Sequence, residues 1–200
     1  MKLNFVEKAL VNSRARAYAQ RRYEAPLLER LGGLVTGGRV LEVGCGRGVG
    51  TEIIFERFGA REVHAFDIDA GMVHKARRRL ARYLPDRLCL GVGDATAIDE
   101  EDASFDAVFD FMIAHHVPEW QRAVSEIARV LRPGGRFFFE EVTRRALSRW
   151  TYRTLFDHPK ENRFSGDEFI AELGRQGIAV DGGCEERFSG DFVIGVGYRS

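Results

Sequence analysis

Five short apolar runs, each followed by a segment with helical periodicity, constrain the fold of this chain more than any other feature. The runs are bounded by Gly, Pro or Asp, and they cover residues 39–44, 62–67, 87–92, 105–111 and 135–142. Strands that alternate with helices are typical of a parallel sheet with right-handed crossovers. The sequence therefore predicts an α/β fold, with a doubly wound and mostly parallel sheet that carries helices on both faces.

Helix and turn signals stand between these runs. Asp69 is placed to cap one helix, and Trp120, with apolar residues 3, 4, 7 and 11 positions later, marks the inner face of another that starts near Pro118. A capping-box sequence begins at Ser165. Beyond it, two strand-like runs at 178–187 and 191–199 flank a short glycine turn, which predicts a C-terminal antiparallel hairpin.

Composition narrows the class of protein. A chain of 200 residues with 44% hydrophobic and 30% charged residues suits one globular domain. Thirty basic residues balance thirty acidic ones, which argues against a dedicated nucleic-acid binder. No run approaches the ~18 apolar residues of a membrane span, so none is expected. The three cysteines are widely spaced, which predicts no metal site and no disulfide framework, and a cytoplasmic location is expected.

The loop after the first predicted strand is the most informative segment. In LEVGCGRGVG, residues 41–50, glycine stands at every second position from 44 to 50. Glycine accepts positive φ and lets a ligand approach the backbone, and this loop lies at a switch point of the sheet. Three interpretations are open. These are a tight turn with incidental glycines, a dinucleotide loop whose GxGxxG fingerprint fails at Val49, and an E-x-G-x-G-x-G loop that begins at Glu42.

This last pattern resembles motif I of the class I S-adenosylmethionine-dependent methyltransferases. An acidic Glu42 suits a cationic sulfonium cofactor but would repel a pyrophosphate. Later segments resemble the other motifs of the family in order, across about residues 35–142: Phe66-Asp67-Ile68-Asp69, Gly93-Asp94-Ala95, Phe105 to Trp120, and Leu131 to Phe137. The chain is most similar to the small-molecule branch, which includes the quinone-biosynthesis methyltransferases.

The resemblance implies a fold, a cofactor and a site. The fold would be a Rossmann-like seven-stranded sheet of order 3-2-1-4-5-7-6. The cofactor would be S-adenosyl-L-methionine, with S-adenosyl-L-homocysteine as product. Asp67 would hold the ribose hydroxyls, Asp94 the adenine amino group, and Ile68 the adenine face. The full set of implied cofactor residues is Glu42, Gly44, Cys45, Gly46, Asp67, Ile68, Asp94, Ala95 and Phe111.

Each acid in this set also has a structural interpretation. Asp67 can cap a strand end, and Asp94 can be a turn residue. Asp69 is expected to cap a helix, and Asp106 is expected to be structural. A nicotinamide-dependent oxidoreductase and a non-catalytic cofactor- or partner-binding module stay open as alternative functions.

Methyl transfer from a sulfonium is an in-line displacement that depends mainly on alignment, and a base is needed only if the nucleophile arrives protonated. His115 and His116, after the fourth strand, are the catalytic candidates, each with a structural alternative. Of Glu140 and Glu141 at the end of the fifth strand, one should face the site, because side chains alternate along a strand.

The acceptor is expected to be a small molecule, aromatic or anionic. Residues 1–200 are interpreted as one domain, in which an N-terminal helical segment at 1–34 serves as a lid, and a segment rich in arginine and aromatic residues at 143–164 borders the substrate. That second segment could instead contact RNA or an anionic membrane surface, or be a solvated helix whose arginines cover apolar surface. The acceptor atom and the oligomeric state are not encoded in any recognised pattern.

Overall fold

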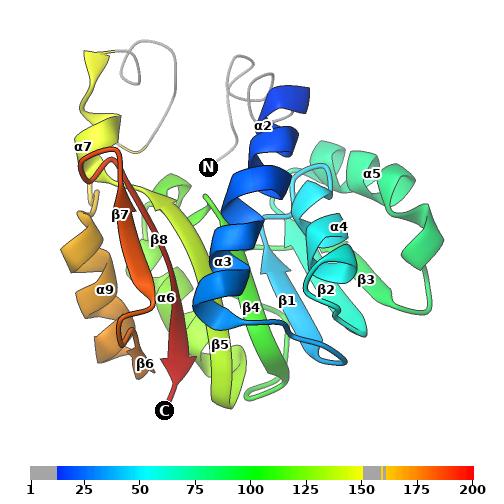
Figure 1. Cartoon of the computed structure of the whole chain (residues 1–200). Helices are drawn as coiled ribbons and strands as arrows, with labels where there is room; N and C mark the ends of the chain where they lie inside the picture. The colour runs from blue at the N-terminus through cyan, green and yellow to red at the C-terminus, as the bar shows by residue number, and fades with distance from the viewer. Residues whose placement is uncertain (1–12, 151–158, 160) are drawn as a thin grey trace.

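A single mixed sheet organises the protein (Figure 1). The structure is a computed structural model, and it describes residues 13–150, 159 and 161–200. The strands, in chain order, are β1 (Arg39–Val43), β2 (Glu62–Asp67), β3 (Leu88–Val92), β4 (Phe105–Phe111), β5 (Leu131–Val142), β6 (Ile178–Ala179), β7 (Cys184–Arg187) and β8 (Phe192–Arg199). They lie side by side in the order β3-β2-β1-β4-β5-β8-β6, and β7 also pairs with β8.

This arrangement confirms the predicted fold. The strands β1 to β5 pair in parallel, and β8 runs antiparallel to β5. The predicted strand at 178–187 is interrupted, because Asp181, Gly182 and Gly183 leave the ladder and Gly182 adopts a φ of +71°. With β6 and β7 counted as this one interrupted strand, the order equals the predicted 3-2-1-4-5-7-6.

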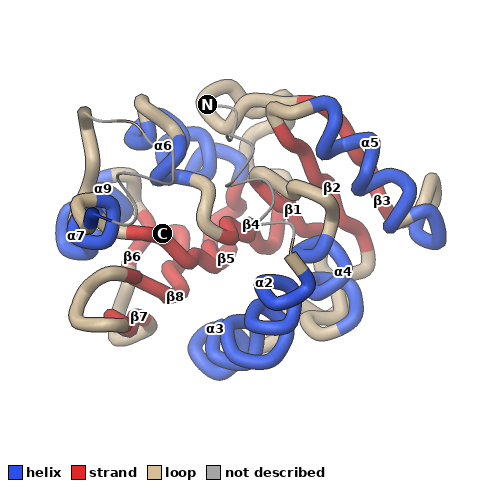
Figure 2. Tube along the Cα trace, turned by 90° about the horizontal axis from the view of Figure 1, so that it is seen from above, coloured by secondary structure: helices blue, strands red, loops and turns tan. Residues whose placement is uncertain are grey.

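Helices cover both faces of the sheet (Figure 2). Those of the described residues are α2 (Arg14–Ala19), the π-helix η1 (Gln20–Glu24), α3 (Ala25–Gly32), α4 (Val49–Glu56), α5 (Ala70–Arg79), η2 (Ala81–Tyr83), η3 (Ala114–His116), α6 (Trp120–Val130), α7 (Arg144–Leu147) and α9 (Gly166–Arg175). Helices α3, α4 and α5 share one apolar core, and α6 and α9 share the other. No helix among the described residues combines the length and apolarity needed to cross a membrane.

The local helix signals are confirmed, with two shifted boundaries. Asp69 caps α5 by accepting from the Gly71 N–H, and Ser165 forms a complete capping box with Glu168. Helix α6 begins at Trp120, because Pro118 lies in the turn before it. Strand β5 begins at Leu131 rather than at 135, because Leu131 already pairs with Phe105 before the register shifts.

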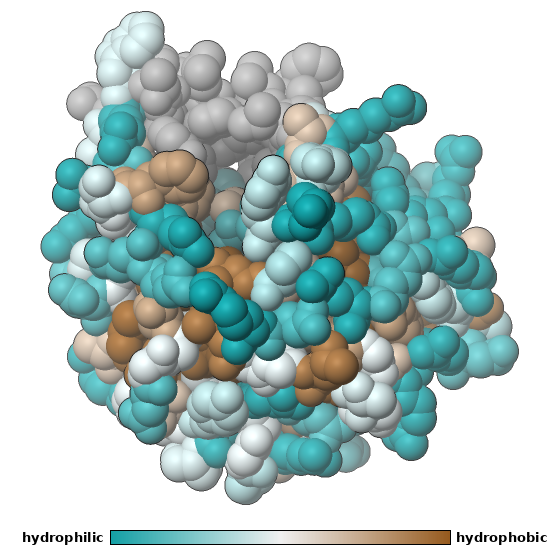
Figure 3. All heavy atoms as spheres, viewed as in Figure 1, coloured by the Kyte–Doolittle hydropathy of each residue, from teal (hydrophilic) through white to brown (hydrophobic). Residues whose placement is uncertain are grey.

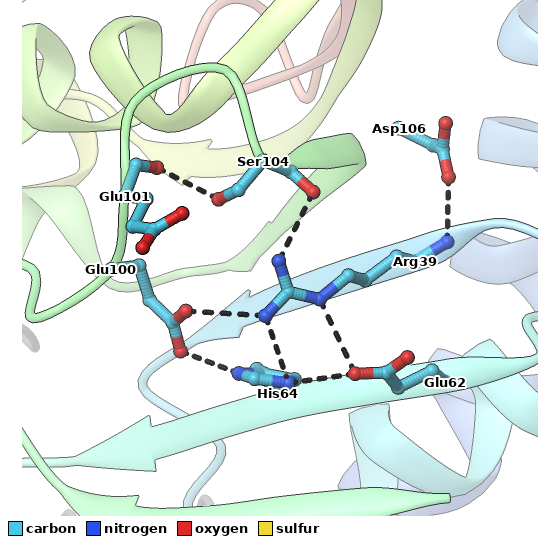
Figure 4. A network of polar contacts seen from close by, with 7 residues as sticks. All are labelled: Arg39, Glu62, His64, Glu100, Glu101, Ser104 and Asp106. Atoms are coloured by element: carbon cyan, nitrogen blue, oxygen red, sulfur yellow. Dashed lines mark hydrogen bonds and ion pairs between the residues drawn. The ribbon is translucent and has the colours of Figure 1, made fainter.

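A polar network connects residues at the amino ends of β1, β2 and β4, the edge of the sheet opposite the carboxyl ends of these strands (Figure 4). The Arg39 N–H donates to Asp106 Oδ2 at 2.6 Å, and the Arg39 guanidinium contacts Glu62 at 3.2 Å and Glu100 at 3.4 Å. His64 Nδ1 lies 2.5 Å from Glu100 Oε1. Asp106 therefore joins β4 to β1, which is the structural role expected for it.

Candidate active site

A cavity of about 920 Å³ opens at the carboxyl ends of the parallel strands. We call the part next to β1, β2 and β3 the cofactor half. Its lining residues are Glu42, Val43, Gly44, Cys45, Gly46, Arg47, Val49, Gly50, Phe66, Asp67, Ile68, Asp69, Met72, Gly93, Asp94, Ala95, Thr96 and Phe111. The acceptor half is lined by Arg16, Ala19, Gln20, Tyr23, Glu24, Leu27, residues 112, 113 and 115–119, Glu140, Val142, Arg187, Phe188, Phe192 and Ile194.

The glycine loop shapes the floor of the cofactor half. At Gly46, with φ +52°, a Cβ would meet no atom of the described residues within 4 Å, and this residue lines the cavity with its backbone. At Gly50 a Cβ would lie 2.0 Å from Glu42 Oε1, so only glycine leaves room for that carboxyl group. The alternating glycines therefore have two roles. Gly46 exposes its backbone to the cavity, and Gly50 leaves room for the Glu42 side chain.

Glu42 is a buried acid between the glycine loop and helix α4. Thr51 Oγ1 donates to its Oε2. Burial raises the pKa of Glu42 to about 8, the hydrogen bond from Thr51 opposes the rise, and the charge of Asp67 adds to it. A positively charged ligand in the cavity would favour the ionised form of this group.

Asp67 ties the first two loops of the sheet together. Its Oδ2 accepts from the Gly46 N–H at 2.8 Å, and its Oδ1 accepts from the Asp69 N–H at 2.8 Å. The N–H of Cys45 also donates to the Phe66 carbonyl at 2.9 Å. The carboxylate is therefore held in place at the edge of the cavity by the backbone of both loops, as the strand-end interpretation expected, and it lines the cavity as well.

The third loop presents Asp94 and Ala95 to the same space. Asp94 Oδ1 accepts from the N–H and the hydroxyl of Thr96 at 2.8 and 2.9 Å, and the backbone hydrogen bond is the main reason that its pKa is lowered. Ile68 leaves 43% of its surface exposed, although it is a large apolar residue, and that surface lines the cavity. Every cofactor residue predicted from the sequence thus lines one cavity.

The loop after β4 is anchored from beneath by Glu141. Its Oε1 accepts from the N–H groups of Ile113 and Ala114 at 2.9 and 2.7 Å, and its Oε2 lies 2.6 Å from His115 Nδ1. Burial raises the pKa of Glu141 to about 7, and burial together with the Glu141 charge raises the pKa of Asp110 well above its ordinary value, which favours a proton on Asp110 beside the Glu141 carboxylate. The alternation at the end of β5 is now fixed, because Glu140 faces the cavity and Glu141 faces the loop.

His115 and His116 both line the acceptor half, with ring centroids 4.1 Å apart. His115 is buried and held by Glu141, whereas His116 is partly exposed. The structure therefore brings both candidate histidines to the place where the sequence predicts them.

A cluster of three ionisable residues, Arg16, Glu24 and Glu140, lies between the N-terminal helices and β5. Arg16 Nη1 lies 2.5 Å from Glu24 Oε2, and Arg16 Nη2 lies 3.4 Å from Glu140 Oε2. Burial raises the pKa of Glu140 well above its ordinary value, and the nearby Glu24 charge adds to the rise. The cluster joins the N-terminal helices to a strand residue 124 positions further along the chain.

The comparisons with known proteins agree with this geometry. A family model described as "Methyltransferase domain" matches residues 40–135. The chain is 35% identical over 144 residues to a fatty-acid O-methyltransferase of Mycolicibacterium smegmatis, an alignment that covers 72% of this chain and 48% of that protein. It is 34% identical over 143 residues to a malonyl-[acyl-carrier protein] O-methyltransferase of Methylococcus capsulatus, with coverages of 70% and 51%. Together these matches support a class I S-adenosylmethionine-dependent methyltransferase.

The methyltransferase fold extends over nearly the whole chain. A methyltransferase of Haloferax volcanii, solved in complex with its activator Trm112, superposes with a TM-score of 0.77 at 19% identity, covering 99% of this chain and 98% of that one. At this identity the likeness shows the fold alone. The chain spans about half the length of the curated relatives it matches. These matches favour a methyltransferase over the nicotinamide-dependent oxidoreductase alternative.

The cofactor half of this methyltransferase fits S-adenosylmethionine. The bare backbone at Gly46 offers space for the cofactor, and Glu42 and Asp67 supply negative charge for its sulfonium and amino groups. Arg47, which the sequence analysis missed, adds a complementary group. Its Nη2 donates to the Ser13 carbonyl at 3.1 Å, and its buried Nε has no hydrogen-bond partner among the described residues, which suits the carboxylate of the cofactor.

Other lining residues of the methyltransferase also escaped the sequence analysis. The hairpin tip contributes Arg187, Phe188 and Phe192, and β8 contributes Ile194. The described part of 143–164 does not line the cavity: Arg144 pairs with Glu168 at 3.0 Å. Residues 151–158 and 160 of that segment lie outside the described residues.

Glu42 makes a testable contribution to stability. A glutamate titrates near 4.5 when it is not perturbed and near 8 in this fold. The folded protein therefore binds more protons than the unfolded chain between these pH values, so its stability falls as pH rises through this window, by up to about 1.4 kcal/mol per pH unit from this group. We expect Glu42→Gln to flatten that dependence. Between pH 5.5 and pH 8 the variant should lose less of its free energy of unfolding than the wild type loses.

Denaturant unfolding at both pH values measures the effect. Glu56→Gln, at an exposed glutamate of α4, is the matched control and should change the pH dependence little. Parallel pH profiles for the wild type and Glu42→Gln would contradict the assignment of the raised pKa to Glu42.

Proposed function

We propose that this protein transfers the methyl group of S-adenosylmethionine to a small-molecule acceptor by in-line displacement. The observation that carries the proposal is one continuous cavity, in which the motif residues line one half and leave an acceptor half beside them. When bound, the cofactor supplies an activated methyl group on a sulfonium. The chain supplies binding, alignment and exclusion of water, which are the main requirements of this reaction.

Each cofactor-half residue has a proposed role. Asp67 accepts hydrogen bonds from the ribose hydroxyls while it keeps the Gly46 N–H in place. Asp94 accepts from the adenine amino group, the Ala95 N–H meets the ring, and Ile68 packs on its face. The bare backbone of the glycine loop, from Gly44 through Cys45 to Gly46, lies along the methionyl part, opposite Glu42 and beside Phe111.

His116 and His115 are proposed to contact the acceptor, or to accept its proton if it arrives protonated. Glu141 supports that role by fixing the loop and by accepting from Nδ1 of His115, which leaves the acceptor lone pair of a neutral ring on Nε2. Residues 1–34 are proposed as a lid, in support of which six residues between positions 16 and 27 line the cavity. The segment 143–164 is also proposed to border the substrate, and its residues 151–158 and 160 lie outside the described residues.

The acceptor is proposed to be an anionic or aromatic small molecule. The two relatives named above are a fatty-acid and a malonyl-[acyl-carrier protein] O-methyltransferase, and a fatty acid and a malonyl group each carry a carboxyl group. The balanced overall charge supports a small-molecule acceptor over a nucleic acid. A cytoplasmic location is proposed as well.

Transfer of a labelled methyl group tests the activity. The protein is incubated with S-adenosylmethionine labelled at the methyl carbon and a metabolite extract, and labelled products are identified by mass spectrometry. We expect a labelled methyl ester or ether that depends on the protein. Tight binding of S-adenosylhomocysteine without any labelled product from extract would instead support the non-catalytic alternative.

A further inference from the structure

We propose that the acceptor half binds a carboxylic acid with an apolar chain, its carboxylate between Arg16 and Glu140 and its chain along Val142, Phe192 and Ile194. The inference rests on the proposed function, because it names the acceptor of that same site.

Arg16 provides a charged donor for the carboxylate. Its Nη1 donates to Glu24 Oε2 at 2.5 Å, whereas its Nη2 makes only long contacts with described residues, at 3.4 Å, to Glu140 Oε2 and Met112 Sδ. Good N–H···O bonds are roughly 2.7–3.2 Å long. Arg16 lines the cavity, and its side chain is only 20% exposed. A ligand oxygen close to Nη2 could therefore accept a shorter hydrogen bond than those that Nη2 makes to Glu140 and Met112.

Glu140 provides the second partner for the same head group. It is buried at the end of β5 and lines the cavity beside Arg16. Burial and the nearby Glu24 charge raise the pKa of Glu140, which favours its protonated form, and a protonated carboxyl group can donate a hydrogen bond to a carboxylate. In that form Glu140 adds no second ionised acid from β5 beside the Arg16–Glu24 pair.

The apolar chain has a continuous path away from this point. Register pairs Glu140 with Ile194 and Val142 with Phe192, so these four side chains share one face of the sheet. All four line the cavity, and Leu27 lines it from α3. Phe188, which is 76% exposed, stands at the hairpin tip, where the cavity meets solvent. Figure 3 shows apolar atoms on this face of the molecule between the N-terminal helices and the hairpin.

A carboxylate also suits the chemistry. Its oxygen is already deprotonated, so it can attack the methyl carbon without a base. The new bond is O–CH₃, the broken bond is S–CH₃, and the electron pair of the broken bond stays on sulfur. The positive sulfonium and the negative carboxylate become a neutral thioether and a neutral methyl ester, and no proton is transferred. The histidines then act as contacts.

Binding to the whole protein saturated with S-adenosylhomocysteine tests the inference. The probes are hexanoate, octanoate, decanoate and dodecanoate, below their aggregation limits, with 1-dodecanol to replace the charged head. We expect calorimetric affinity to rise by up to about fourfold per added methylene. We expect dodecanoate to bind at least tenfold more tightly than 1-dodecanol. The absence of carboxylate binding, or equal binding of acid and alcohol, would overturn the inference without using any variant.

Two variants localise the site. Arg16→Gln should weaken dodecanoate at least tenfold and leave S-adenosylhomocysteine affinity within about twofold, because Arg16 lies in the acceptor half. Arg30→Gln, at an exposed arginine of α3 that pairs with Glu185, should change neither. Equal dodecanoate affinity for a folded Arg16→Gln protein would overturn the placement of the head group.

Failure of the proposed function gives a different result. If S-adenosylhomocysteine itself does not bind, the proposed function fails. If it binds and the labelled methyl group reaches an acceptor without a carboxyl group, only this inference fails.

Discussion

Replacement of Glu141 by alanine is expected to lower the free energy of unfolding by about 3–5 kcal/mol, the largest stability change we predict for a single site. Glu141 is fully buried and accepts from the N–H groups of Ile113, Ala114 and His115 at 2.7–3.1 Å. Its loss would remove the acceptor of the Ala114 and His115 backbone N–H groups, of the His115 ring N–H and of the Asp110 proton, whereas the Ile113 N–H also donates to Asp110 Oδ1 at 2.8 Å. Urea denaturation at neutral pH measures the effect.

Two comparisons separate this anchor from a general effect of a smaller side chain. Glu141→Gln keeps one oxygen that can accept from some of these donors, but its amide NH₂ group would face the others. We therefore expect a loss of unfolding free energy between that of Glu141→Ala and zero. Glu185→Ala, at a more exposed glutamate of β7, should cost less than about 1 kcal/mol. A loss below about 1 kcal/mol for Glu141→Ala would show that the loop does not depend on this carboxylate.

Replacement of Asp67 by alanine is expected to weaken S-adenosylhomocysteine binding by about 30- to 150-fold, equivalent to about 2–3 kcal/mol. The carboxylate has two functions in this account. It accepts hydrogen bonds from the cofactor ribose, and it holds the glycine loop through the 2.8 Å bond from the Gly46 N–H. Both are lost in the variant, and titration calorimetry measures the affinity.

Asp69→Ala is the matched control, two residues further along the same loop. Asp69 caps α5 through the Gly71 N–H at 2.8 Å, so its loss should reduce stability by about 1 kcal/mol and change affinity only a few-fold. If a folded Asp67→Ala protein kept its affinity, Asp67 would be only a strand-end cap.

The cofactor half could be predicted from the sequence for a simple physical reason. Its residues follow the ends of consecutive parallel strands, and the carboxyl ends of such strands meet at one edge of the sheet. Glu42, Asp67 and Asp94 are therefore close in space because each lies at the end of its own strand. The helix starts at Asp69 and Ser165 could be predicted as well, because a helix cap depends only on residues a few positions away.

The acceptor half could not be predicted in this way. Arg16 and Glu140 are 124 positions apart, and no periodicity links a helix to a strand across that distance. The alternation of Glu140 and Glu141 was expected, but which one faces the cavity depends on the pairing of β5 with β8. The hairpin tip reaches the cavity because β7 pairs antiparallel with β8, which is itself antiparallel to β5, so that β7 and β5 end at the same edge of the sheet. Arg47, by contrast, was visible as a lone cation inside the glycine loop.

Titration calorimetry of the wild-type protein with S-adenosylmethionine, S-adenosylhomocysteine and NADH tests the central claim most directly. The account predicts saturable one-site binding of both S-adenosyl compounds and no measurable heat of binding from NADH, because Glu42 faces the space that a pyrophosphate would need. Binding of NADH without binding of either S-adenosyl compound would contradict it.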